Sequence, residues 1–351
     1  FETFTGPEDN WLPPDNYQQH GTGQVAHRTS PTNIGMFLAS ALSARDLGFV
    51  TTSDLLVRCR NTVATLGRLE TYRGHVLNWY DTRSLAPLEP RYVSMVDSGN
   101  LAVALVALKQ GCLEAAEGPP FEMACWNAPR TTMALLIEAL SRIPEAKHAA
   151  LEKCEQRIDA SIERVWHDAE RWKKVADDLA GPLMQDVENA VQESIAASDA
   201  IATETLGEIR MWLGVLHLQV HALKRDVFFY FPWTDLLANP PEQFAKDALD
   251  IARILSPQKP MPDLIAGANT MLDEFDRLLI EVAPSQEGHG WLADLRRAVE
   301  EGIARQSDLS RDLGALAERC DALAYGMDFA FLYDPEARLC LLYTSPSPRD
   351  H

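Results

Sequence analysis

Residues His75 to Asn100 read HVLNWYDTRSLAPLEPRYVSMVDSGN and connect two apolar segments with helical spacing. Pro87 and Pro90 prevent one continuous helix here. The stretch is longer than a simple helix connection and places polar groups beside two large aromatic rings, which suits a polar, ring-shaped ligand. We therefore expect it to form the rim of a binding cleft. Its candidate ligand-binding residues are Asn78, Trp79, Tyr80, Asp81, Arg83, Arg91, Tyr92, Asp97, Ser98 and Asn100.

The segments around this rim predict helices. Ser30 is a good N-cap and Pro31 suits the first helical position, so a helix is expected from there to the stop at Gly48. A second helix is expected over about residues 53–70, and a third from Asp97 or Ser98, where Asp97 equally suits a purely structural cap. The fold class predicted for the chain is all-α.

The second half of the chain has a different character. From Pro144 the chain predicts long, charged helices, with Pro182 restarting one of them. The contiguous aromatic residues from Phe228 to Trp233 indicate a packing hub at a helix end, because they lack polar partners. Charges alternate along these helices and indicate solvated faces without chemistry of their own.

Composition limits the possible functions. The 351 residues carry a net charge of -19, with Asp+Glu 51 against Lys+Arg 32, which argues against nucleic acid or an anionic membrane as a partner. Residues 27–110 are different, with nine Lys or Arg against six Asp or Glu. The six cysteines show no close pairing and are expected to be reduced and buried. We also expect no membrane-spanning segment.

No metal or cofactor motif is evident. His217 and His221 are spaced to share a helix face, but two ordinary histidines explain the pair better than zinc without a third ligand nearby. The sequence has no phosphate-binding glycine loop, nucleophile elbow or catalytic-cysteine signature. We expect no cofactor and no metal.

The end of the chain breaks the helical pattern. Residues 327–339 predict a strand, a turn and the start of a returning strand. Residues 340–351, beginning CLLYTSPSPRD, match a translated sequencing adapter, and we expect them to be an artefact. The absence of Met at Phe1 leads us to expect an internal piece of a longer protein.

Four sequence blocks carry a family resemblance. They are EDNWLPPDNYQ (residues 8–18), HRTSPTNIGMFLASALSARDLGF (27–49), NWYDTRSLAPLEPRYVSMVDSGNLA (78–102) and MDFAFLYDPEARL (327–339). Together they closely resemble the glucoamylase-like region of bacterial cyclic β-1,2-glucan synthases. The segment from about Pro144 to Tyr325 carries no motif of that family.

The resemblance implies a partial (α/α)6 barrel with an inserted helical bundle and a broken β-hairpin at its end. The domains would be an extended lead-in (1–26), the first barrel helices (27–143) with the rim loop (71–100), the inserted bundle (144–325) and the hairpin start (326–339). The family's catalytic carboxylates would follow the hairpin, so none is assigned and this piece alone should be inactive. Arg28, Thr29 and Asn33 would join the rim if the first and third helices pack together.

The implied partner is a β-1,2-glucan chain, which the region would close into a ring by retaining transglycosylation. The parent would be a large enzyme of the bacterial inner membrane that polymerises glucose from UDP-glucose. This segment would lie at the cytoplasmic face without touching the membrane. Two alternatives remain open from the residues: a stand-alone β-1,2-glucan hydrolase of the same barrel type, and a non-catalytic helical scaffold whose rim loop only caps helices.

Overall fold

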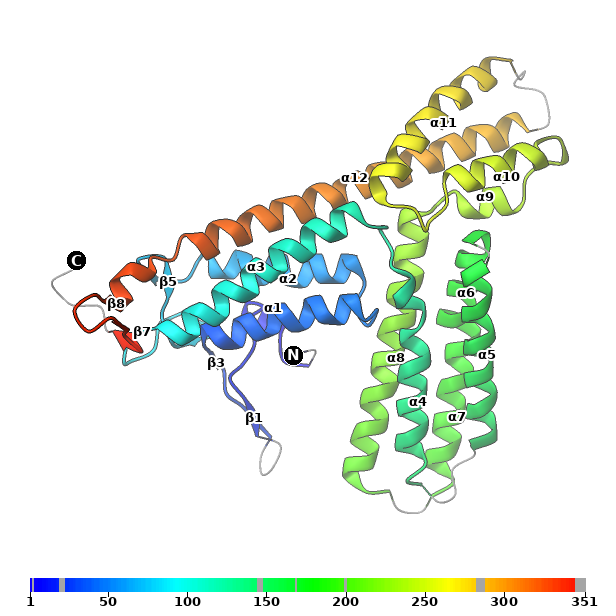
Figure 1. Ribbon diagram of the computed structural model, residues 1–351. Coiled ribbons are helices and arrows are strands. Elements are labelled where there is room, and N and C mark those ends of the chain that lie inside the picture. Colours follow the sequence, from blue (N-terminus) through cyan, green and yellow to red (C-terminus); the bar gives the residue numbers. More distant parts are fainter. Residues whose placement is uncertain are drawn as a thin grey trace. The chain divides into compact units, whose positions relative to one another are not determined.

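The computed structural model describes residues 1, 3–18, 23–143, 148–167, 169–198, 201–281 and 288–344. Helices dominate it and the strands are two-residue pairs, so the all-α prediction is confirmed (Figure 1). Two compact units divide the chain. Unit 1 comprises 1–44, 53–116 and 311–351, and unit 2 comprises 45–52 and 117–310.

Unit 1 is built from α1 (Pro31–Asp46), α2 (Thr52–Leu66), α3 (Met95–Glu117) and the last part of α12 (His289–Tyr325), which lie side by side in Figure 1. The sequence begins α1 as expected, since the Asn33 amide donates to the Ser30 hydroxyl at 3.2 Å.

Helices α1 and α3 pack directly on each other. A Cβ on Gly35 would lie 3.2 Å from the Asn100 carbonyl oxygen, and one on Gly111 would lie 2.4 Å from a methyl of Leu42. The small residues therefore allow the two helices to approach closely, and they bring the start of α1 to the start of α3.

Three free cysteines, each from a different helix, lie in the core of unit 1. Cys59 of α2, Cys112 of α3 and Cys320 of α12 are each fully buried. Burial is the largest cause of the raised pKa values of Cys59 and Cys320, the latter reaching about 12. The raised pKa values favour the protonated thiols. Cys125 and Cys154 are also free and buried, as predicted, whereas Cys340 is exposed.

Short strand pairs hold the loops of unit 1. Each pair is antiparallel. The pairs are β1 (Tyr17–Gln18) with β2 (Gln24–Val25), β3 (Arg28–Thr29) with β6 (Tyr80–Asp81), β4 (Thr71–Tyr72) with β5 (His75–Val76), β7 (Val93–Ser94) with β10 (Tyr343–Thr344), and β8 (Tyr333–Asp334) with β9 (Leu339–Cys340).

The β4–β5 hairpin connects the rim to the end of α12. Arg73 and Gly74 form its two-residue turn with φ of 51° and 81°, the conformation of the tightest hairpin loops. A Cβ on Gly74 would lie 2.0 Å from the Gly326 carbonyl oxygen, so only glycine permits this approach. His75 then reaches Asp328, with its Nε2 2.9 Å from the backbone oxygen.

Unit 2 contains the remaining helices. After the 3-10 turn η2 (Met123–Trp126) come α4 (Ala128–Leu140), α5 (His148–His167), η3 (Ala169–Arg171), α6 (Trp172–Asp178), the π-helical turn η4 (Leu179–Leu183), α7 (Met184–Ala196), α8 (Thr203–Tyr230), α9 (Thr234–Ala238), η5 (Glu242–Phe244), α10 (Ala245–Ile254), α11 (Met261–Glu281) and the first part of α12.

An aromatic cluster forms the core of unit 2. The Trp126 and Trp172 ring centroids lie 5.6 Å apart, and Phe231 is 5.7 Å from Trp172. Phe231 and Trp233 are fully buried, which confirms a packing hub after α8, whereas Phe228 and Phe229 are exposed.

Several predicted boundaries were wrong. Helix α3 already begins at Met95, since Ser94 caps it by accepting from the Asp97 amide at 3.2 Å. Pro182 does not start a helix but lies within a π-helical turn, which accommodates its missing N–H. Residues 329–332 form a 3-10 turn rather than a strand, so the predicted hairpin is only two residues long on each side.

The compact units also divide the chain differently from the predicted domains. Residues 117–143 group with unit 2, because α4 packs along α8. Residues 311–325 group with unit 1, because α12 is long enough to serve both units.

Candidate functional site

The residues with the family resemblance meet in unit 1. Strand β3 pairs with β6, so that Arg28 lies opposite Asp81 and Thr29 opposite Tyr80. Phe329 and Phe331 pack edge-on against His75 at 4.7 and 5.4 Å. Blocks from the beginning, middle and end of the chain are therefore neighbours in space.

The exposed Arg28 lies against the half-buried Trp79 in the rim. The Arg28 guanidinium carbon lies 4.7 Å from the centre of the Trp79 ring, within the range of a cation–π contact. Asp15 of the lead-in accepts hydrogen bonds from Arg28 Nε and Nη2 at 3.1 and 2.9 Å. It also accepts one from the side-chain Nδ2 of Asn33 at 3.3 Å. Asp15 and the Trp79 ring therefore hold Arg28 beside Asn33 and Trp79.

Asn78 organises a second group of candidates beneath this surface. Its backbone N–H donates to the Tyr92 carbonyl at 2.9 Å, and its side chain is buried. The surrounding donors and acceptors determine its amide orientation. Its nitrogen donates to Asp97 Oδ2 at 3.0 Å, and its oxygen accepts from Trp79 Nε1 at 3.1 Å and from the Tyr92 hydroxyl at 2.7 Å. One buried amide therefore links Trp79, Tyr92 and Asp97.

Asp81 has a structural role in the rim loop. One carboxylate oxygen, Oδ1, accepts from Ser84 N at 2.7 Å, Ser84 Oγ at 2.9 Å and Arg83 N at 3.1 Å. The bond from the Ser84 amide is the main reason that the pKa of Asp81 is lowered. This carboxylate is ionised at neutral pH, and its Oδ2 accepts no hydrogen bond from the residues that the structure describes.

Two other candidates, Tyr80 and Arg91, also have partners within the protein. The buried Tyr80 hydroxyl donates to the Glu70 carbonyl and accepts from Leu77 N at 2.9 Å, and burial raises its pKa. Arg91 pairs with Glu70 and Glu89 at 3.0 and 3.2 Å.

Asn100 and two hydroxyls complete the candidate set. The Asn100 amide donates to Thr32 Oγ1 at 3.0 Å, which joins the starts of α1 and α3. The hydroxyls of Thr29 and Ser98 are buried and have no hydrogen-bond partner within the described structure.

Sequence reasoning missed a buried acid of this region. Asp9 is buried, and its Oδ1 lies 2.8 Å from His27 Nδ1, 2.6 Å from Thr82 Oγ1 and 3.8 Å from Arg83 Nε. Asn10 donates to the carbonyl oxygens of Thr82 and Arg83 at 2.9 and 3.0 Å. The lead-in, interpreted as merely extended, therefore fixes the rim loop from below.

The position of the His27 proton follows from this network. Arg83 Nη2 lies 2.9 Å from His27 Nε2, and a guanidinium can only donate. His27 Nε2 must therefore accept, and its Nδ1 carries the proton donated to Asp9. The His27 ring therefore links the buried Asp9 to Arg83.

No group of three potential metal ligands occurs among the described residues, and the His217 and His221 rings simply lie 4.2 Å apart. Within the same residues, no helix is both long and apolar enough to cross a bilayer.

Comparison with known proteins gives one relative. No protein-family model matches the chain. Over 219 residues, or 62% of its length, the chain is 36% identical to the cyclic beta-(1,2)-glucan synthase NdvB of Rhizobium meliloti (strain 1021). The match spans only 8% of that protein. It supports a relation to the cyclic β-1,2-glucan synthases, in agreement with the motif blocks.

Proposed function

We propose that this chain is part of a cyclic β-1,2-glucan synthase and that unit 1 forms one wall of the cleft for the glucan chain. The observation that carries the proposal is that the first three resembling blocks meet at the β3–β6 pair, while the last block packs against the neighbouring β4–β5 hairpin. Because the similarity to NdvB spans a small part of that protein, the activity proposed is that of the complete enzyme.

The chemistry of the rim suits a neutral sugar chain. A pyranose ring presents apolar C–H faces and a ring of hydroxyls, which aromatic and hydrogen-bonding side chains recognise together. Trp79 supplies the ring, Arg28 and Arg83 supply donors, and Asp97 and the free oxygen of Asp81 supply acceptors. The buried Asn78 holds Trp79 and Asp97 in place.

We assign no catalytic carboxylate. Retaining glycoside chemistry requires two carboxyl groups about 5–5.5 Å apart, one as nucleophile and one as acid. In our proposal the region belongs to an (α/α)6 barrel that cyclises the chain by retaining transglycosylation, with its catalytic acids on another part of the enzyme. The complete enzyme would be anchored in the inner membrane, with this region at its cytoplasmic face.

A second candidate is a non-catalytic scaffold. It is favoured by the intramolecular roles of Tyr80, Arg91 and the Oδ1 atom of Asp81. Arg28 and Trp79 distinguish the two, because the scaffold needs neither to contact a ligand.

Binding of linear β-1,2-gluco-oligosaccharides, measured by isothermal titration calorimetry, tests the proposal. We expect Trp79→Ala to weaken binding at least about tenfold, since stacking on an aromatic ring contributes over 1 kcal/mol. The matched control is Trp166→Ala on α5, a tryptophan that is 46% exposed in unit 2. Trp79→Phe keeps a ring and should retain most of the affinity. Equal affinity of wild type and Trp79→Ala would favour the scaffold.

A complete reading frame distinguishes the two enzymes. Cyclic products from linear β-1,2-glucan indicate transglycosylation, and only shortened linear products indicate the hydrolase. Asp81→Asn is informative here, because an amide oxygen can still accept from Ser84 and preserve the turn. Impaired turnover by a folded Asp81→Asn enzyme would indicate that the Asp81 carboxylate acts on the glucan. Unchanged turnover would remove Asp81 from the site.

A further inference from the structure

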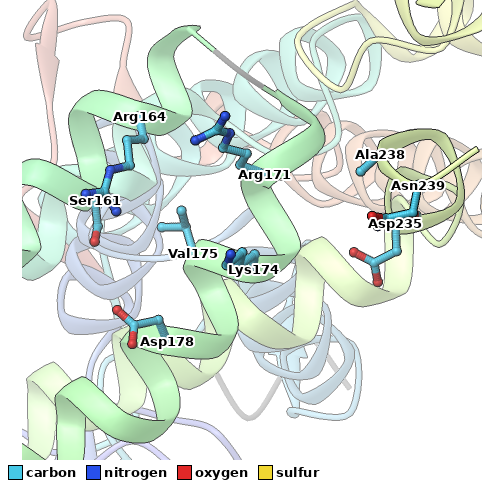
Figure 2. A pocket seen from close by; sticks show the side chains of 9 residues that line it. All are labelled: Ser161, Arg164, Arg171, Lys174, Val175, Asp178, Asp235, Ala238 and Asn239. Atoms are coloured by element: carbon cyan, nitrogen blue, oxygen red, sulfur yellow. Dashed lines mark hydrogen bonds between the residues drawn. The ribbon is translucent and has the colours of Figure 1, made fainter. Parts of the chain in front are cut away.

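Unit 2 contains a pocket of about 710 Å³ whose walls are three helix faces (Figure 2). Its lining residues recur at helical spacing on α5, on η3 with α6, and on α9. They are Ser161, Arg164, Arg171, Lys174, Val175, Asp178, Asp235, Ala238 and Asn239. A volume of this size suits a small organic molecule.

The charge of the pocket opposes that of its surroundings. Residues 117–310 carry 33 Asp or Glu against 19 Lys or Arg, yet Arg164, Arg171 and Lys174 all line this one cavity. Gathering three cations costs Coulomb energy unless an anion offsets it. Arg164 and Lys174 are exposed, and neither side chain has an ion-pair or hydrogen-bond partner among the residues that the structure describes.

The two acids of the pocket have cationic partners outside it, and one of these, Arg157, is shared with Asp186. Asp178 lies 3.5 Å from Arg157, and Asp235 lies 3.2 Å from the buried Lys173. Neither Arg157 nor Lys173 lines the cavity. The lining itself carries three cationic and two acidic side chains, a formal charge of +1.

The opposite end of the pocket offers a carboxylate and an amide as hydrogen-bonding groups. Asp235 and Asn239 lie together on and just after α9, away from the cations in Figure 2. An acid and an amide side by side suit the hydroxyls of a polyol. Guanidinium and ammonium groups at the other end suit the oxygens of a phosphate.

We propose that this pocket binds a phosphate ester of a sugar or polyol, with the phosphate on Arg164, Arg171 and Lys174 and the hydroxyls toward Asp235 and Asn239. The site lies wholly within unit 2 and does not depend on the glucan-binding role of unit 1. A free phosphate ester and the phosphate headgroup of a lipid share this chemistry, and the proposal is for the free ester.

Titration calorimetry on the full chain with glucose 6-phosphate tests the site. We expect Arg164→Ala and Lys174→Ala each to weaken binding about tenfold, as for loss of one charged hydrogen bond. Arg210→Ala, an exposed arginine of α8 outside the pocket, should bind like wild type. Glucose and inorganic phosphate, each offering half of the ligand, should bind more weakly than glucose 6-phosphate.

Three results would overturn the proposal. The first is no binding of glucose 6-phosphate to the wild-type chain. The second is that the Arg164→Ala and Lys174→Ala variants bind it as tightly as the wild type does. The third is that the chain binds phosphatidylglycerol vesicles but not the free ester, which would assign the cations to a lipid surface. Glucan binding by the same samples is a separate measurement, so failure of this site leaves the rim untouched.

Discussion

Asp9 should be the acid on which the rim loop depends most. The prediction concerns Asp9→Asn, which keeps the size of the side chain but removes its charge. In the structure Asp9 Oδ1 accepts from both His27 Nδ1 and Thr82 Oγ1 and faces Arg83. An amide oxygen is a weaker acceptor, and the new NH2 group adds donors where donors already converge.

The magnitude follows from these contacts. A hydrogen bond to a charged group contributes about 1.5–3 kcal/mol, and a buried donor left without a partner costs about 1–3 kcal/mol. Asp9→Asn weakens two such bonds without deleting both, so we expect unit 1 to lose about 2–4 kcal/mol. Asp15→Asn is the matched control, because its partner Arg28 has a side chain 52% exposed, and an exposed pair contributes at most about 1 kcal/mol.

Hydrogen exchange detected by mass spectrometry is the suitable assay, because two units need not unfold together. The Thr82 amide donates to the His27 carbonyl at 3.1 Å, so peptides containing Thr82 report opening of the rim directly. Faster exchange there in Asp9→Asn than in Asp15→Asn is the expected result. Equal exchange in the two variants would refute the reasoning that the buried acid holds the loop.

Three further substitutions test the packing. Gly74→Ala would place a Cβ 2.0 Å from the Gly326 carbonyl oxygen at a φ of 81°, so it should lower the free energy of unfolding in urea by about 2–4 kcal/mol. The control Gly99→Ala has open space around it in α3 and should be neutral or slightly stabilising. Burial lowers the pKa of His75, so as pH falls below about 6.5 the unfolded chain takes up a proton at His75 before the folded chain does, and stability should decrease. His75→Gln should reduce this difference in stability between pH 5 and pH 7, measured by urea titration. Trp172→Ala should destabilise unit 2 by about 3–5 kcal/mol in thermal unfolding while leaving exchange in unit 1 unchanged, and equal effects in both units would contradict this.

Local signals predicted much of unit 1. The Ser30–Pro31 start, the apolar stripe behind it and the length of the rim loop are properties of neighbouring residues, and they correctly indicated α1 and the break before α3. The start of α3 was misplaced by two or three residues because Asp97 and Ser94 both suit a cap, and only the structure shows that Ser94 accepts the bond.

Contacts between distant residues could not be predicted in the same way. Asp9 lies 18 positions from His27 and 73 from Thr82, and nothing in the local pattern of an extended lead-in indicates a buried acid. The cation-lined pocket left a weak signal, since Arg171, Lys174 and Asp178 recur at helical spacing. Charges at such spacing usually mark a solvated face, so the pattern became informative only once α5 and α9 closed around it.

The rim loop unites the two interpretations that the sequence left open. A loop that binds a ligand by stacking must hold its aromatic ring before the ligand arrives, because ordering it during binding would consume affinity. Asn78 provides this order for Trp79, and Asp9 provides it for Arg83 through His27. The intramolecular bonds that favour a scaffold are thus the same ones that a prearranged glucan surface requires. For this reason the contribution of Trp79 to binding, rather than the loop's stability, separates the two functions.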